Sequence, residues 1–142
     1  MERREVVVDA SVVVKWFIEE EFSREARLLR DAYADGLVDI VAPSLLPYEV
    51  LNALKYSGAF GEDELKEVAT AIEDFQIRLF NLQGELARKA IELAMRKGIT
   101  VYDASYVALA HILGTIVYTA DEKLIKKTHE LGYVKHIVQF KI

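Results

Sequence analysis

The sequence contains no cysteine, and this absence excludes several kinds of chemistry at once. Without thiols the chain forms no disulfide, has no thiol nucleophile and offers no thiolate ligand to a metal ion. Histidine is scarce as well, and the wide spacing of His111, His129 and His136 is unlike that of zinc ligands. A zinc site is therefore not expected, and each histidine is interpreted as an ordinary surface or core residue.

Long apolar runs are also missing. No stretch reaches the roughly 18 residues of a membrane helix, and residues 1–5 mix charges of both signs rather than opening a secretory signal. The composition, 52% hydrophobic and 29% charged over 142 residues, fits one folded domain spanning residues 1–142. We expect a cytoplasmic protein without membrane association.

Basic residues are outnumbered by acidic ones, 18 to 23, which gives a net charge of -5. A nucleic-acid-binding protein usually carries a basic face, so the overall charge argues mildly against this class. If four carboxylates bound cations, however, the rest of the chain would be close to neutral. The composition is therefore compatible with an acidic, metal-dependent nuclease.

Short apolar runs alternate with helical patterns along the whole chain. Strands are predicted at residues 5–8, 39–42, 76–82, 115–118 and 136–140. Helices are predicted near residues 12–18, 23–34, 44–56, 62–75, 85–96, 100–113 and 121–131, with Ser23 and Ser44 as N-terminal caps. This alternation predicts an α/β fold, a roughly five-stranded parallel sheet flanked by helices on both faces.

Four acidic residues stand at the ends of predicted elements. Asp9 ends the first strand, and Asp121 follows the strand at 115–118, so both should reach the edge where ligands gather in open α/β sheets. Glu49 lies in the first half of the helix that starts from this edge. Asp103 lies in the first turn of the helix after Thr100. The four side chains could therefore converge.

Each acid also has an ordinary structural explanation. Asp9 could cap the following helix, Asp103 and Thr100 are spaced as in a capping box, and Asp121 suits a helix N-terminus. Glu49 is harder to explain in this way, because its neighbours are mostly apolar and an unpaired carboxylate there is costly to desolvate. A metal ion or a strong hydrogen-bond donor would resolve that cost.

Two polar residues lie close to these acids in sequence. Asn52 is three positions after Glu49 on the same helical face, where it could hold Glu49, bind a ligand or be an ordinary surface residue. Thr119 lies two positions before Asp121 and could orient a water or a metal-bound carboxylate.

The sequence Asp-Ala-Ser occurs after both a Val-Val and a Val-Tyr pair, at residues 9–11 and 103–105. Ser11 and Ser105 could hydrogen-bond the neighbouring carboxylates, or could be present for their small size. The flanking sequences differ, so we interpret the two stretches as pieces of one site rather than as a repeat. Such an oxygen-rich set suits Mg²⁺ or Mn²⁺. Two such ions about 3.5–4 Å apart can activate water for phosphodiester hydrolysis.

Four stretches resemble the acidic motifs of the PIN-domain family, in the family's order and spacing: VVVDASVVVKWF, PSLLPYEVLNALKY, TVYDASYVALA and YTADEKLIKK. The resemblance covers essentially the whole chain and is strongest to the VapC-like ribonuclease toxins of type II toxin–antitoxin systems. It implies a parallel sheet of about five strands, Mg²⁺- or Mn²⁺-dependent hydrolysis of single-stranded RNA, a small antitoxin partner and a homodimer.

The resemblance also implies roles for particular residues. The acidic cluster would consist of Asp9, Glu49, Asp103 and Asp121, with Asp9 and Asp103 as the main metal ligands. Thr119 matches the family's small hydroxyl residue before the last acid. Lys15 matches a basic residue common after the first motif, and its alternative interpretation is a solvated helix lysine.

Two alternative functions remain open, namely a PIN-like protein that binds RNA or a partner without turnover, and a housekeeping PIN nuclease without an antitoxin. Two other Mg²⁺-dependent classes are rejected. A phosphotransfer receiver would need an acidic pair after the first strand. A haloacid-dehalogenase-type phosphatase would need a second aspartate where Ser11 stands.

Overall fold

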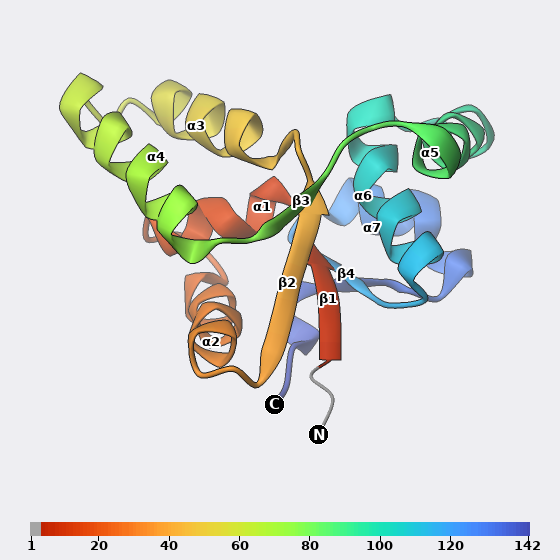
Figure 1. The fold of residues 1–142 in the computed structure, drawn as a ribbon, viewed down its shortest axis with the longest axis horizontal. Helices are drawn as coiled ribbons and strands as arrows, with labels where there is room; N and C mark the ends of the chain where they lie inside the picture. The colour runs from red at the N-terminus through yellow and green to blue at the C-terminus, as the bar shows by residue number, and fades with distance from the viewer. Residues whose placement is uncertain (1–3) are drawn as a thin grey trace.

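A computed structural model describes residues 4–142 and contains one five-stranded sheet between two layers of helices (Figure 1). Every strand pairing is parallel, and the strand order is β3-β2-β1-β4-β5. The strands are β1 Arg4–Val8, β2 Val38–Pro43, β3 Arg78–Phe80, β4 Val117–Thr119 and β5 Val134–His136. The predicted α/β fold with a five-stranded parallel sheet is confirmed.

The helices fall into two groups on opposite sides of the sheet (Figure 1). One group comprises α1 Ala10–Val13 with the 3₁₀ turn η1 Val14–Trp16, α2 Ser23–Ala34, α3 Leu46–Ser57 and α4 Glu62–Phe75. The other comprises α5 Gly84–Lys97, α6 Val101–Leu113 and α7 Glu122–Thr128. The chain runs outward from β1 to β3 and then places β4 and β5 on the other side of β1. Right-handed crossovers in opposite directions put the two groups of helices on opposite faces.

The core lies between these layers and is centred on β1. Val6, Val7 and Val8 are fully buried, as expected for a central parallel strand that is covered on both faces. Trp16, just beyond β1, is also buried. Its Nε1 donates a hydrogen bond to the Ala26 carbonyl at 2.9 Å. The segment that follows β1 is therefore anchored on both sides of Asp9.

Two predicted helix caps are wrong. Ser23 is the first residue of α2, and its hydroxyl accepts from the Glu20 backbone and donates to the Ile18 carbonyl instead of capping the helix. Ser44 precedes α3 by two residues, and its backbone N–H donates to the Phe80 carbonyl at 2.9 Å. The N-cap residues are instead Phe22 for α2 and Leu45 for α3, and neither makes a side-chain capping hydrogen bond.

The predicted final strand at 136–140 is also wrong, although its first residue does end β5. The backbone N–H of Val138 donates to Nδ1 of His136 at 3.0 Å, and this bond turns the chain into the 3₁₀ turn η3, Ile137–Gln139. The apolar composition reflects burial of Ile137 and Phe140 rather than a strand. Phe140 packs edge-on against Tyr118, with ring centroids 5.6 Å apart.

None of the helices within residues 4–142 has both the length and the apolar character needed to cross a membrane.

Candidate functional site

The four residues of the acidic cluster all stand at helix N-termini along one edge of the sheet. Asp9 follows β1 directly and is the N-cap of α1, and Asp121 follows β4 as the N-cap of α7. Glu49 and Asp103 lie in the first turns of α3 and α6. In Figure 1 the carboxyl end of β2 lies between these two helices. The positive ends of several helix dipoles therefore help to stabilise a concentration of negative charge.

These carboxylates influence one another electrostatically. The pKa of Asp9 is raised from 3.8 to about 6, chiefly by burial and to a smaller extent by the charges of Asp103 and Asp121. Burial raises the pKa of Asp103, and the Asp121 charge adds to this effect. The pKa of Glu49 is also raised by burial and by the Asp103 charge. The fold thus brings four acids that are far apart in sequence into one electrostatic neighbourhood.

No cation neutralises this neighbourhood directly, since none of the ion pairs within residues 4–142 includes a member of the acidic cluster. Over the same residues, no three acidic or histidine side chains are already gathered tightly enough to enclose a metal ion. The chemistry of the set nevertheless fits Mg²⁺ or Mn²⁺, which prefer oxygen ligands. A divalent cation would also relieve the repulsion that, together with burial, raises the pKa values of Asp9, Glu49 and Asp103.

Ser11 connects the ends of β1 and β4 beside Asp9. Its backbone N–H and its hydroxyl both donate to Oδ1 of Asp9. The same hydroxyl accepts from the Ala120 backbone N–H at 2.9 Å and lies 3.3 Å from the Thr119 hydroxyl. The expected contact between Ser11 and a carboxylate is thus present, and it also fixes the loop that leads to Asp121.

Ser105 behaves differently from its counterpart. Its hydroxyl donates to the Tyr102 carbonyl at 2.6 Å, inside its own helix, rather than to a carboxylate. Asp103 is instead bound through its backbone N–H, which donates to the Thr100 hydroxyl at 3.0 Å. The two Asp-Ala-Ser stretches therefore have different local roles.

Asp9 and Asp121 also have the helix-capping roles that the sequence suggested. Asp9 caps α1 through Ser11, and Asp121 caps α7 by accepting from the backbones of Lys123 and Leu124. Capping fixes the position of each carboxyl group at the sheet edge. It is thus compatible with a second role for the same side chain.

Glu49 has a hydrogen-bond donor that the sequence did not predict. The hydroxyl of Tyr106 donates to Glu49 Oε1 at 2.7 Å, and Tyr106 itself is buried in α6. Burial raises the pKa of the Tyr106 hydroxyl, and the bond to Glu49 adds to this, so the tyrosine stays protonated. The only sequence signal for this role is its position three residues after Asp103, on the same helix.

Thr119 is fully buried, and its hydroxyl accepts from the Asp121 backbone N–H at 3.0 Å. Together with Ser11 it lowers the pKa of Asp9, although burial dominates. Asn52 is exposed on α3 and lines a shallow hollow with Glu49, whose carboxylate is held by Tyr106.

Lys15 is not the solvated helix lysine that the sequence allowed. Its side chain is only 9% exposed, and its Nζ lies 3.0 Å from Oε1 of Glu20. We call the cavity that these residues line the lysine cleft. It has a volume of about 460 Å³ and is lined by Ala10, Ser11, Val14, Lys15, Ile18, Glu20, Glu49, Ala53, Ser57 and Ala120. Glu49 and Ser11 make the lysine cleft continuous with the acidic cluster.

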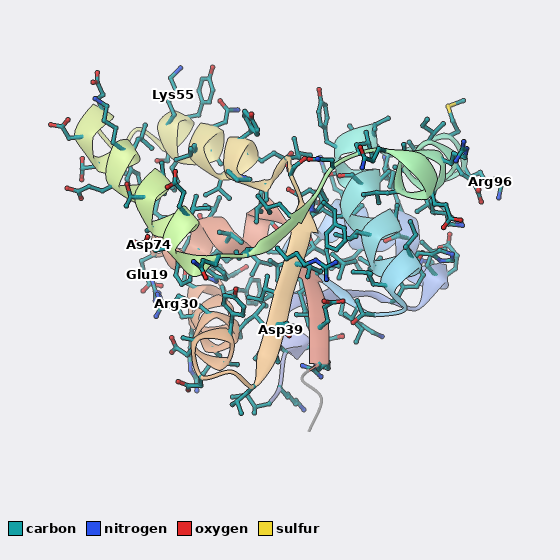
Figure 2. All side chains as sticks on the ribbon, viewed as in Figure 1. Glu19, Arg30, Asp39, Lys55, Asp74 and Arg96 are labelled. Carbon is teal, nitrogen blue, oxygen red and sulfur yellow. The ribbon has the colours of Figure 1, made fainter. Side chains whose placement is uncertain are left out.

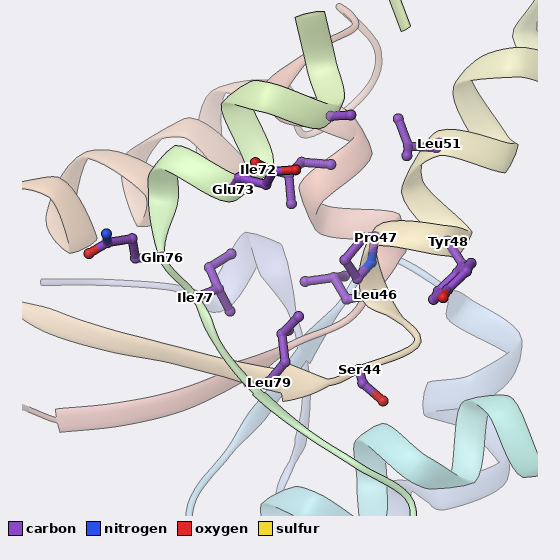
Figure 3. Close-up of a pocket in the computed structure, with 11 residues that line it drawn as sticks. Ser44, Leu46, Pro47, Tyr48, Leu51, Ile72, Glu73, Gln76, Ile77 and Leu79 are labelled. Atoms are coloured by element: carbon purple, nitrogen blue, oxygen red, sulfur yellow. The ribbon is translucent and has the colours of Figure 1, made fainter. Parts of the chain in front are cut away.

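Two further depressions flank α3. The tyrosine hollow, about 370 Å³, is lined by Leu45, Tyr48, Glu49, Asn52 and Tyr102. An apolar groove of about 460 Å³ lies between α3, α4 and the chain around β3, where Leu46, Ile77 and Leu79 point toward one another (Figure 3). Tyr48 belongs to both depressions, but the groove contains no member of the acidic cluster.

Comparisons with known proteins agree with this geometry. The model of the PIN domain matches residues 6–130. The chain is 35% identical over 127 residues to Ribonuclease VapC3 of Pyrobaculum aerophilum, covering 86% of this chain and 93% of that protein.

Two solved structures share the fold. A toxin–antitoxin complex from Klebsiella pneumoniae has a TM-score of 0.70 and 15% identity, covering 96% of this chain and 99% of that one. The sarcin–ricin loop cleaving toxin VapC20 of Mycobacterium tuberculosis has a TM-score of 0.68 and 17% identity, covering 91% and 96%. The chain therefore belongs to the PIN-domain family and is a VapC-like member of it.

Proposed function

We propose that this protein is a Mg²⁺- or Mn²⁺-dependent endoribonuclease that hydrolyses single-stranded RNA. The observation that carries the proposal is the acidic cluster, in which four carboxylates share one edge of the sheet and no ion pair within residues 4–142 neutralises them. The name of the relative Ribonuclease VapC3 supports RNA as the substrate.

Asp9 and Asp103 are proposed as the main metal ligands, with Glu49 and Asp121 completing the set partly through water. A bound divalent cation would lower the pKa of a water molecule and stabilise negative charge on the phosphate. The chain supplies the orientation: Ser11 holds Asp9, and Tyr106 holds Glu49. With a pKa of about 6, Asp9 is mostly ionised at neutral pH and can act as a ligand there.

Lys15 is proposed to meet the RNA backbone from the lysine cleft. Its ammonium group is held by Glu20, and Lys15 lines the same cleft as Ser11 and Glu49. A fixed cation at this position would offset repulsion between the acids and the phosphate that approaches them. Lys123, Lys126 and Lys127 of α7 are exposed and could add weaker contacts.

An antitoxin partner is the second part of the proposal. It is supported by the similarity to a toxin–antitoxin complex and by the unneutralised acids. An arginine inserted by a small partner protein would pair with these carboxylates in a bidentate manner and block the site. Co-purification of this chain with the product of a short neighbouring reading frame would test the idea. Absence of such a partner would favour a housekeeping nuclease.

A homodimer is also proposed. Ile91 and Met95 are exposed apolar residues four positions apart on α5, so they form a stripe that a second copy could cover. Location in the cytoplasm and a domain spanning residues 1–142 remain predictions.

The direct test is an RNA cleavage assay with the purified protein and an unstructured oligonucleotide. Cleavage should require Mn²⁺ or Mg²⁺, stop with EDTA, and be abolished by Asp9→Asn. The matched control is Asp63→Asn, which changes an exposed acid on α4 and should leave cleavage unchanged. Cleavage that survives Asp9→Asn in contaminant-free protein would refute the assigned site. Metal binding without turnover of any RNA would favour the binding-protein alternative.

A further inference from the structure

Two exposed tyrosines stand immediately before members of the acidic cluster. Tyr48 precedes Glu49 at the start of α3, and Tyr102 precedes Asp103 at the start of α6. Their residues are 76% and 61% exposed. Although 54 positions separate them in the chain, both line the tyrosine hollow, and Glu49 forms part of its wall.

The helix geometry explains this pairing of an acid with an outward tyrosine. Consecutive residues of a helix point in directions about 100° apart, so a helix start that turns its acid toward the sheet edge turns the preceding residue outward. Both helices repeat this arrangement on either side of the end of β2 (Figure 1). The result is two large, amphipathic rings beside the acidic cluster. Exposed aromatic rings in such a setting indicate a binding role.

We propose that Tyr48 and Tyr102 form a stacking subsite for an unpaired base of the RNA, next to the phosphate that is cleaved. The inference rests on the proposed ribonuclease function and deepens it by naming what holds the substrate. Aromatic side chains commonly hold single strands by stacking on the faces of the bases. Because Glu49 belongs to both the tyrosine hollow and the acidic cluster, a base in the hollow would adjoin a phosphate at the carboxylates.

Charge favours a base over a second phosphate at this position. The nearby carboxylates repel a second phosphate, whereas the flat face of a base is uncharged and can approach them. The hollow, about 370 Å³, falls within the size range of sites that hold small ligands. The amide of Asn52, which can both donate and accept a hydrogen bond, lies on the wall where the edge of a base would be.

The same helix provides a matched control. Tyr56 lies eight positions after Tyr48 on α3 and is 75% exposed, but it does not line the tyrosine hollow. Nζ of Lys55 lies 4.9 Å from the centroid of the Tyr56 ring. Figure 2 shows Lys55 on the outer side of α3. Replacing Tyr56 removes a comparable exposed ring from the same helix without touching the proposed subsite.

The experiment measures binding of a fluorescent single-stranded RNA whose cleavage position has been mapped with the wild-type protein. Asp9→Asn serves as the parent protein, so that bound RNA stays intact. Adding Tyr48→Ala or Tyr102→Ala should raise Kd by about 5- to 150-fold, the range for loss of one base–aromatic stack. Tyr48→Phe and Tyr102→Phe should leave Kd near the parent value, and Tyr56→Ala should leave it unchanged.

A second RNA identifies the contacted group. An abasic nucleotide beside the cleavage position should weaken binding to the parent by a similar factor. It should not further weaken binding to the alanine variant of the tyrosine that stacks on that base, because the contact is already lost. Additive losses would show that the ring and the base do not touch, and would overturn the subsite.

The remaining outcomes separate this inference from the proposed function. If the wild-type protein cleaves RNA but Tyr48→Ala and Tyr102→Ala bind it as Tyr56→Ala does, the subsite is wrong and the ribonuclease proposal stands. If the two variants bind RNA normally but lose a protein partner, the tyrosines are a protein-docking surface and the subsite is again wrong. If the wild-type protein neither binds nor cleaves RNA, the proposed function is wrong and the subsite is wrong with it.

Discussion

The hydroxyl of Tyr106 lies 2.7 Å from Oε1 of Glu49 and donates a hydrogen bond to it. This bond connects α6 to α3, two helices that lie on opposite faces of the sheet (Figure 1). Burial raises the pKa of Glu49, whereas the bond from Tyr106 lowers it. Tyr106 is therefore a positioning residue, which directs the Glu49 carboxylate and helps to keep it ionised.

Replacing Tyr106 with phenylalanine tests this role. Tyr106→Phe removes the donor but keeps the ring, so the pKa of Glu49 should rise and a smaller fraction of Glu49 should be ionised at a given pH. The acidic limb of the pH profile of kcat/KM should therefore move to higher pH. The free energy of unfolding should fall by roughly 1 kcal/mol for the lost hydrogen bond. Initial cleavage rates across pH and urea unfolding measure the two effects.

Tyr133→Phe is the matched control, because it also removes a tyrosine hydroxyl but one that faces His111, 3.4 Å from its Nδ1. Its pH profile should match that of the wild-type protein. A Tyr106→Phe profile whose acidic limb stays in place would contradict the positioning role.

Asp9 should make the metal-free protein less stable at neutral pH than at low pH. Its pKa is about 6 in the folded protein and close to 3.8 when unfolded, so the folded state binds the proton more tightly. Stability from this group is fully present below pH 3.8 and is lost as the pH rises through 6, by at most about 3 kcal/mol. With EDTA at pH 7.5, Asp9→Asn should therefore raise the free energy of unfolding by about 1–3 kcal/mol. The gain should shrink at pH 4.

Divalent metal should reverse the order of stability of the wild-type protein and Asp9→Asn, so that the wild-type protein becomes the more stable of the two. A cation that binds only the folded protein stabilises it in proportion to the logarithm of its concentration over Kd. Adding Mn²⁺ should therefore raise the Tm of the wild-type protein and of Asp63→Asn, but have little effect on Asp9→Asn. Equal Tm shifts in all three proteins would place the bound metal away from Asp9.

The parts of the fold that the sequence predicts well are those with strong local signals. The apolar run Val6–Val8, followed by the polar Asp9, predicts a buried strand that ends at the sheet edge. The amphipathic pattern of α4 begins after Gly61 and ends before Gln76, at the predicted residues. Three of the four acids follow from the same logic, because they stand where a strand ends or a helix begins. Glu49 is expected in the first half of a helix that starts from the same edge, and its costly burial among apolar neighbours singles it out further.

The contacts that complete the site depend on packing between distant elements. The bond from Tyr106 to Glu49 spans 57 positions and exists only because α3 and α6 meet at the sheet edge. The burial of Lys15 was missed because α1 and η1 are short, so the chain turns back and brings Glu20 over the lysine. No periodic pattern in the sequence indicates the Tyr106–Glu49 bond or the Lys15–Glu20 pair.

The proposed dimer makes a prediction about α5. Met95→Glu places a charge in the exposed stripe with Ile91, and should convert a dimer into a monomer if a second copy covers this stripe. Light scattering after size-exclusion chromatography measures the mass directly. Leu37→Glu is the control, since Leu37 is also an exposed apolar residue but lies between α2 and β2. A Met95→Glu protein that remains dimeric would exclude this stripe from the interface.

Substitutions of Glu20 and Lys15 can separate a structural role of Lys15 from a role in RNA binding. Lys15 is 9% exposed and Glu20 is 43% exposed, so the pair is closed on the lysine side only. Glu20→Gln leaves a nearly buried ammonium group without its carboxylate, and should lower the free energy of unfolding by about 1–2 kcal/mol. This value is below the cost of breaking a fully buried pair, because solvent still reaches the site of Glu20.

Lys15→Met should affect RNA binding more than it affects stability. Methionine keeps most of the apolar stem, and Glu20 can turn to solvent, so the free energy of unfolding should change by less than about 1 kcal/mol. RNA binding should nevertheless weaken, because the lysine cleft, which Glu49 also lines, loses its cation. If Lys15 contacts one phosphate, the slope of log Kd against log salt concentration should decrease by about 0.7 for a single strand. An unchanged slope together with unchanged kcat/KM would assign Lys15 a purely structural role.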